Sequence, residues 1–314
     1  MPAGRIDTHH HIYPPKYLAD AREQIARATH AHFHRISQWT PGRSLEAMDR
    51  DGIATAIVSI SPSLWFGDIA ATRKIAREWN EYAAGLVRDH RGRFALFATL
   101  PLPDVDASLR EIEHALDTLG AVGFGLVTNY GDKWPGDKAF APVFDELNRR
   151  KAVVYFHPTD SPAFDGILPD VPSPMIEFPF DSTRAIVSLL FSGTFTRCAD
   201  ARYIFSHGGG ALPMLAARIV QVAGNRKDLS ARVPNGVMAE LRKLYYDIAG
   251  INHPIPFNAI RELVGPSQIL FGTDFPFWSP NVAVKVLDDL AVAGADRERI
   301  ERGNALAMMP ALAP

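Results

Sequence analysis

The sequence has 314 residues and lacks several features, and each absence excludes a class of protein. Cys198 is the single cysteine, so the chain forms no internal disulfide and is not a disulfide-stabilised scaffold. No run of about 18 apolar residues occurs, which excludes a membrane-spanning helix. The 33 basic and 35 acidic residues nearly balance, which argues against nucleic acid or a membrane surface as a partner. The first residues carry no basic segment followed by an apolar run, so we expect no signal peptide and a cytoplasmic protein.

The composition nevertheless provides ample material for a large core. Apolar residues make up 47% of the chain and charged residues 22%, which is typical of a globular protein. We find no internal repeat, low-complexity segment or domain boundary, and therefore expect one domain over residues 1–314. This length is unusual for a single core, but an α/β barrel reaches it as one domain.

Eight segments of strand length, seven of them apolar runs, alternate with longer helical segments. The predicted strands span 5–11, 55–61, 94–101, 122–129, 152–158, 202–207, 244–250 and 269–276. The predicted helices span 44–51, 69–90, 105–119, 140–150, 180–194, 211–224, 255–264 and 281–293, with a last helix at 296–309. Near-continuous apolar strands are typical of a parallel sheet that is buried on both faces. The pattern predicts an α/β fold of the TIM-type (β/α)8 barrel, with a doubly wound open sheet as the alternative.

Two connections are too long to be simple links between a strand and a helix. Residues 12–43 follow the first strand, and residues 158–179 follow the fifth strand and are rich in proline. Long loops in a compact domain are usually functional or disordered. Both loops follow the ends of strands where barrels place their active sites, so we expect them to form walls or a lid.

The first predicted strand, RIDTHHH, contains the clearest chemical signal. Because side chains alternate along a strand, His9 and His11 share one face, while His10 points the other way. Asp7 falls on the same face as His9 and His11, one layer deeper. Neutral imidazole is the commonest protein ligand for zinc and related metals, so this strand predicts part of a metal site.

Further ionisable residues stand where other predicted strands end. His157 ends the fifth strand, His207 the sixth and Asp274 the eighth, each after an apolar run. Asp247 ends the seventh strand, but no chemistry assigns it a role. In a barrel the strand ends converge on one mouth, where His9 and His11 also lie. This set can fill a metal shell and leave one position open, as catalytic metal sites do.

Four short motifs carry a resemblance to a known family: Asp7-Thr8-His9-His10-His11, Tyr155-Phe156-His157-Pro158, Ser206-His207-Gly208-Gly209-Gly210 and Gly272-Thr273-Asp274-Phe275-Pro276. Together they resemble the amidohydrolase superfamily and, within it, the branch of metal-dependent non-oxidative decarboxylases. That branch includes aminocarboxymuconate-semialdehyde decarboxylase and γ-resorcylate decarboxylase. The nearest resemblance is to 6-methylsalicylate decarboxylases, through segments 39–41, 48–53, 147–154 and 174–176. It extends from residue 5 to about residue 306.

The resemblance implies one divalent metal ion, zinc in the first place and manganese as the alternative, since nitrogen and oxygen ligands suit both. The implied metal ligands are His9, His11, His157 and Asp274. It also implies that His207 is the catalytic histidine beside the metal.

Two arginines lie at or beside positions where the family has arginines that bind the substrate. Arg218 follows His207 by eleven residues and matches an arginine that reaches the neighbouring subunit's substrate. Arg43 lies within one residue of the other family arginine. The resemblance therefore implies a homodimer or a higher homo-oligomer.

We predict decarboxylation of a small aromatic carboxylic acid with an ortho hydroxyl, in which Asp274 donates a proton to the ring and His207 tunes or relays it. The alternative is hydrolysis of a lactone, ester or amide, with Asp274 as the base that activates water. A metal-binding barrel without chemistry is a third possibility.

Other aromatic residues and histidines remain near the predicted mouth. Four aromatic side chains could stack on a substrate ring or simply pack in its walls: Trp39, Trp65, Phe180 and Trp278. His30, His32 and His34 alternate as His9 and His11 do, but no apolar strand surrounds them, so we interpret them as surface or lid residues.

Overall fold

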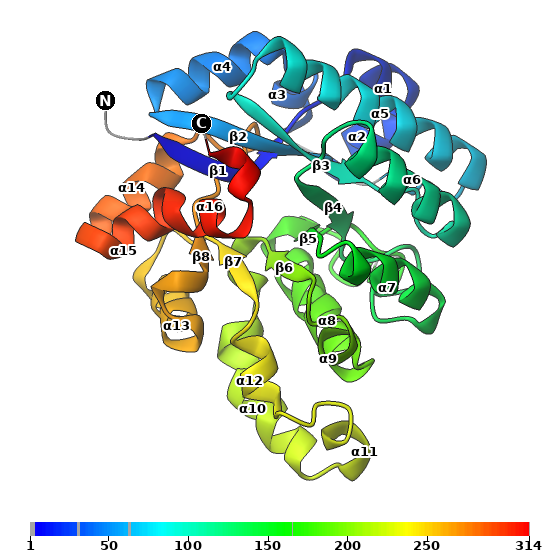
Figure 1. Ribbon diagram of the computed structural model, residues 1–314, viewed down its shortest axis with the longest axis vertical. Helices are drawn as coiled ribbons and strands as arrows, with labels where there is room; N and C mark the ends of the chain where they lie inside the picture. The colour runs from blue at the N-terminus through cyan, green and yellow to red at the C-terminus, as the bar shows by residue number, and fades with distance from the viewer. Residues whose placement is uncertain (1–3, 30–31, 62–63, 165, 314) are drawn as a thin grey trace.

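The computed structural model describes residues 4–29, 32–61, 64–164 and 166–313 and is organised around eight parallel strands (Figure 1). Each strand pairs in parallel with the next one in the chain. The strands are β1 (Arg5–His11), β2 (Ile53–Ser59), β3 (Phe94–Thr99), β4 (Gly123–Val127), β5 (Val153–His157), β6 (Arg202–Phe205), β7 (Tyr245–Asp247) and β8 (Ile269–Leu270). With helices around it, this sheet confirms the predicted (β/α)8 barrel.

The strands are surrounded by helices, which include the eight that the sequence predicts, one after each strand. The α-helices are α1 (Pro15–Asp20), α2 (Arg22–Thr29), α3 (Phe33–Ile36), α4 (Pro41–Arg50), α5 (Ile69–Asp89), α6 (Val105–Asp117), α7 (Ala141–Arg149), α8 (Glu177–Phe191), α9 (Thr194–Arg197), α10 (Leu212–Gly224), α11 (Lys227–Ser230), α12 (Val237–Leu241), α13 (Pro254–Val264), α14 (Asn281–Asp289), α15 (Gly294–Glu298) and α16 (Asn304–Met308). A π-helical turn, Arg299–Gly303, divides the predicted last helix into α15 and α16. Within the described ranges, every helix is too short or too polar to cross a membrane.

The barrel closes between β8 and β1. The predicted strand 269–276 is regular only over its first two residues, but the chain continues beside β1. The backbone N–H of Thr8 donates to Phe271 O at 3.0 Å, and that of His11 donates to Phe275 O at 2.7 Å. This seam brings the first strand against residues more than 260 positions away.

The lumen of the barrel is apolar below the mouth. Its core comprises Ile6, Ile57, Ala95, Phe97, Val153, Tyr155, Ile204 and Leu270 from the strands, and Ala305, Met308 and Met309 from the C-terminal segment. The α16 segment therefore covers the end of the barrel opposite the mouth (Figure 1). Tyr155 stacks on Phe97 with ring centroids 5.6 Å apart. The lumen is a packed core and not a channel.

Candidate metal centre

A register shift in β1 decides where its histidines point. Ile6 lies in the lumen core, so unbroken alternation would turn His9 and His11 away from the lumen. The pairing of β1 with β2 shifts between Asp7 and His10, which restores the inward direction of His9 and His11. Asp7 instead contacts His10 Nδ1 at 3.1 Å. The prediction that Asp7 shares a face with His9 and His11 is therefore wrong, because it assumed an uninterrupted strand.

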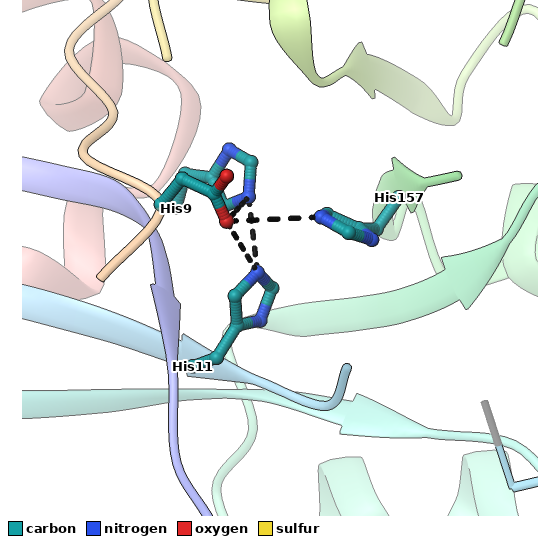
Figure 2. A group of neighbouring side chains, drawn as sticks. His9, His11 and His157 are labelled. Carbon is teal, nitrogen blue, oxygen red and sulfur yellow. Dashed lines mark hydrogen bonds and ion pairs between the residues drawn. The ribbon is translucent and has the colours of Figure 1, made fainter. Parts of the chain in front are cut away.

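Three imidazoles and one carboxylate bring their ligand atoms together at the mouth. His9, His11, His157 and Asp274 are buried, and one ligand atom from each lies within 4.8 Å of all the others. The Nε2 atoms of His9 and His11 are 3.0 Å apart. The Oδ1 atom of Asp274 lies 3.1, 3.2 and 3.9 Å from the Nε2 atoms of His9, His11 and His157. Figure 2 shows the three imidazoles pointing toward one another.

The chemistry of this group fits a divalent metal ion. Among the described residues, neither His157 Nε2 nor Asp274 Oδ1 has a hydrogen-bond partner, although both atoms are buried. Buried polar atoms normally have partners, so each exception requires an explanation. Three nitrogens and one oxygen that face the same point are a donor set for zinc or manganese.

The second nitrogen of each imidazole is anchored to another group. His11 Nδ1 lies 3.3 Å from Ser59 O, and His157 Nδ1 lies 2.8 Å from Pro158 O. A carbonyl oxygen only accepts, so His157 Nδ1 carries the hydrogen and donates it, which leaves its Nε2 lone pair free. His11 Nδ1 also lies 3.2 Å from the Ser59 hydroxyl oxygen. His9 Nδ1 lies 2.9 Å from a carboxylate oxygen of Asp247. Such partners orient metal-binding histidines and fix their tautomers.

The sequence reasoning named Asp247 but gave it no role, whereas the structure places it beside the metal-ligand candidates. It is fully buried at the end of β7. Besides His9, it accepts hydrogen bonds from the backbone N–H groups of His207 and Ala249, both at 3.0 Å, and from the Tyr155 hydroxyl at 3.3 Å. Asp247 therefore holds the His207 loop and one imidazole of the group together. Its position at a strand end was the available signal.

The electrostatics of the group also favour a cation. Burial alone lowers the pKa of His9, but the charges of Asp247 and Asp274 outweigh burial and raise it to about 10. Burial alone raises the pKa of Asp274, but the charge of His9 and the close contacts with His11 and His157 hold it well below its usual range. For His11 and His157, burial lowers the pKa to about 4. Positive charge is thus favoured beside Asp274, where a metal ion is expected.

His207 lies beside the group on a strained turn. It has a φ of +52°, and Asp274 has a φ of +59°, values that are uncommon outside glycine and that cluster at functional sites. Its Nδ1 donates to Ala249 O at 3.0 Å, so its Nε2 faces Asp274 Oδ2 at 3.9 Å. A side chain at Gly210 would come within 1.9 Å of Pro179 O, so only glycine fits the turn. Burial lowers the pKa of His207 to about 4.

A cavity of about 970 Å³ lies among the segments that follow β1, β2, β4 and β5. Gln24 and Arg27 of α2 line it, as do Trp65, Asn129 and several residues between 159 and 177. Both long segments that the sequence singled out therefore supply walls at this end of the barrel.

The two predicted substrate arginines lie outside the group. Arg43 is exposed in α4, and its Nη1 donates to Gln38 Oε1 at 3.1 Å. Arg218 is exposed in α10 and makes no hydrogen bond or ion pair to another described residue. Figure 1 shows that α10 extends away from the barrel together with α11 and α12. Within one chain, therefore, neither arginine is part of the metal group.

The remaining aromatic side chains and histidines have varied positions. Trp39 is buried in the wall, Trp65 lines the cavity, and Phe180 and Trp278 are exposed by 43% and 47%. The His32 ring lies 5.6 Å from that of Phe277 and 5.9 Å from that of Trp278. His34 is exposed beside Gln38, and His30 lies outside the described residues.

Comparison with known proteins gives consistent matches over the whole barrel. The family model described as amidohydrolase matches residues 6–310. Decarboxylase yanB of Aspergillus niger is 36% identical over 98% of this chain and 87% of its own length. The 6-methylsalicylic acid decarboxylase of Penicillium expansum is 30% identical over 98% of this chain and 97% of its own length.

Solved structures show the same fold. A dihydroxybenzoic acid decarboxylase from a Polaromonas species, solved with bound manganese and the inhibitor 2-nitroresorcinol, matches with a TM-score of 0.86 at 22% identity. The match covers 99% of this chain and 98% of that structure.

Proposed function

The chain belongs to the amidohydrolase family, and from that premise we propose that it is a metal-dependent carboxy-lyase. Its substrate would be an aromatic carboxylic acid with an ortho hydroxyl, of the 6-methylsalicylate kind. The observation that carries the proposal is the group of three Nε2 atoms and one carboxylate oxygen, with His207 beside it, at the mouth of the barrel. Support comes from relatives that are decarboxylases and that match 98% of the chain.

His9, His11, His157 and Asp274 would hold the metal ion. When bound, the metal supplies a Lewis acid that can fix and polarise the carboxylate and hydroxyl oxygens of the substrate. We propose zinc first, because three imidazoles and a carboxylate suit it well. Manganese is the alternative, and the Polaromonas decarboxylase contains it.

Asp274 and His207 would move the proton. The Oδ1 atom of Asp274 faces the imidazoles, and its Oδ2 atom faces His207. Because its pKa is held well below the usual range, Asp274 is ionised and must first take a proton, which the ortho hydroxyl of the substrate would supply. Asp274 Oδ2 then donates this proton to the ring carbon that bears the carboxylate. The carbon–carbon bond breaks, its electron pair restores the aromatic ring, and CO2 leaves. The product phenolate takes a proton from solvent by way of His207.

Turnover of metal-loaded protein tests the reaction class. We would follow CO2 release and ring absorbance with 6-methylsalicylate and other ortho-hydroxybenzoates, beside a His207→Ala control. Turnover that the substitution abolishes supports decarboxylation. Hydrolysis of a lactone, ester or amide without CO2 release from any of these acids would overturn it and favour the hydrolase alternative.

We further propose that the active form is a homodimer or higher homo-oligomer in which Arg218 serves the neighbouring subunit and Arg43 its own. Arg218 is exposed on α10 and has no partner within the part of the chain that the structure describes, which supports this. Subunit mixing tests it, because His207→Ala and Arg218→Ala proteins would each be inactive alone. Together they would regain activity in mixed dimers, where the Arg218→Ala subunit keeps His207 and receives the partner's arginine. A mixture of His207→Ala with His157→Ala should stay inactive, and no recovery in the first mixture would overturn the shared site.

A further inference from the structure

His10 stands between two of the proposed metal ligands, yet its ring points away from them. The ring is fully buried and stacks on Phe275, with centroids 4.7 Å apart and planes 20° apart. Both of its nitrogens are occupied: Nδ1 lies 3.1 Å from Asp7 Oδ2, and Nε2 lies 2.9 Å from Ser44 Oγ. A buried imidazole with two partners and a stacked face is held in a single orientation.

The hydrogen bonds in this chain of contacts are all donated in one direction, from Trp39 through Ser44 and His10 to Asp7. The indole N–H of Trp39 can only donate, and it donates to Ser44 Oγ at 3.0 Å. The hydroxyl hydrogen of Ser44 is then free to donate to His10 Nε2. A carboxylate only accepts, so His10 carries a hydrogen on Nδ1 and donates it to Asp7. Trp39 and Ser44, from the segment around α4, therefore set the tautomer that His10 presents to Asp7.

Asp7 connects this chain to the metal centre. Its Oδ1 accepts the backbone N–H groups of His9 and Thr273, both at 3.0 Å, and its Oδ2 accepts the Thr273 hydroxyl at 2.6 Å. His9 is a proposed ligand, and Thr273 directly precedes another, Asp274. One fully buried carboxylate thus joins the two segments that supply ligands from opposite ends of the sequence.

The contact between Asp7 and His10 also lies across the register shift of β1. Residues three positions apart face opposite sides of a regular strand, so these two side chains meet only because the register shifts between them. Bulges of this kind re-aim side chains beside active sites. Here the shift aims His9 and His11 into the mouth.

We propose that His10 is a positioning residue for the metal centre. Supported by Ser44 and Trp39, it holds the Asp7 carboxylate in the register shift that aims His9 and Asp274 at one point. The inference rests on the proposed metal centre, but not on the identity of the substrate. Loss of such an outer partner lowers metal affinity by about 10- to 100-fold in other sites.

Zinc binding to the metal-free protein, measured in competition with a chromogenic chelator, tests this without turnover. His10→Phe keeps an aromatic ring against Phe275 but removes both hydrogen bonds, and should weaken zinc binding by about 10- to 100-fold. His10→Asn places an amide nitrogen near the position of Nδ1, so it keeps the donor to Asp7. It should bind zinc more tightly than His10→Phe, because it keeps the donor to Asp7 and loses only the hydrogen bond with Ser44 and the stacking on Phe275.

A matched pair of serine substitutions tests the far end of the chain. Ser44 and Ser108 are both fully buried, and each is the fourth helical residue after its N-cap, Thr40 or Asp104. Ser108 donates to Asp104 O at 2.7 Å, and α6 supplies none of the ligands. Ser44→Ala should weaken zinc binding by about 2- to 10-fold, the value of one hydrogen bond, while Ser108→Ala should leave it unchanged.

Folded His10→Phe protein with unchanged zinc affinity would overturn the proposal. If that variant does not fold, the serine pair decides, and equal zinc affinity of Ser44→Ala and Ser108→Ala would overturn it. Protein that binds zinc as described but decarboxylates no ortho-hydroxybenzoate would support this inference while it refutes the proposed activity. Protein that binds neither zinc nor manganese would overturn the metal centre and this inference with it.

Discussion

The mouth and the lumen of the barrel are built on the same strands and are equally buried, but they contain opposite chemistry. On β5, Tyr155 packs in the lumen, while His157, two residues later, leaves a nitrogen without a hydrogen-bond partner among the described residues. On β1, Ile6 faces the lumen and His9 faces the mouth. Apolar burial stabilises the fold, whereas buried polar atoms without partners cost free energy. The difference indicates that the lumen provides stability and that the mouth keeps unpaired polar atoms for a ligand.

The largest effect is expected at the mouth. His157→Asn keeps a donor near the position of Nδ1 but removes the unpaired Nε2, so kcat/KM should fall by at least about 10³-fold, or about 4 kcal/mol. The free energy of unfolding of the metal-free protein should change by less than about 1.5 kcal/mol, because no hydrogen bond of Nε2 is lost. Steady-state kinetics and urea unfolding measure the two quantities. Activity within tenfold of the unchanged protein would contradict the ligand role.

The opposite result is expected in the lumen. Met308→Ala, at the closed end of the barrel, should lower the free energy of unfolding by about 2–5 kcal/mol through lost burial and a new cavity. The kcat of the folded protein should stay within about twofold, because Met308 contacts the core and not the ligand group. Urea unfolding and kinetics at low temperature measure both. A large loss of kcat in fully folded protein would break the separation between the two regions.

Metal should stabilise the protein only through the mouth. A ligand at 100 times its dissociation constant stabilises the folded state by about 2.7 kcal/mol when it does not bind the unfolded chain. Zinc should therefore raise the melting temperature of the unchanged protein and of Met308→Ala to a similar extent, and a chelator should reverse the rise. His157→Asn serves as the control and should show no rise. An equal rise in that variant would place the zinc elsewhere.

The smallest effect is expected at the boundary between the two regions. The Tyr155 ring stacks on Phe97 in the lumen, while its hydroxyl donates to Asp247 at the mouth. Tyr155→Phe keeps the ring, so the free energy of unfolding should fall by about 1 kcal/mol or less. Zinc affinity should fall by less than about tenfold, since Asp247 keeps its other donors. Thermal melts and chelator competition measure these values. A loss of zinc affinity above 100-fold would show that the Tyr155 hydroxyl belongs to the metal centre and not to the boundary.

Much of the fold and of the site could be predicted because the signals are local. Apolar runs located seven strands, the alternation in RIDTHHH located β1, and polar residues at strand ends located His157, His207 and Asp274. The predicted eighth strand was too long, because most of it pairs with β1 without forming a regular ladder. Asp247 could not be ranked above other carboxylates, since its role depends on contacts with β1, β5 and the loop after β6.

The sequence by itself determined the barrel class and the set of residues able to bind a metal, because periodicity and residue type are properties of short segments. Only the tertiary structure decided which carboxylate joins the metal group and which one supports it from behind. Asp7 and Asp274 are far apart in the chain, and the closing seam of the barrel places one on the outer face with His10 and the other among the imidazoles. The physical reason is that a one-residue register shift reverses the face of every following side chain, and that shift is held by partners more than 260 residues away.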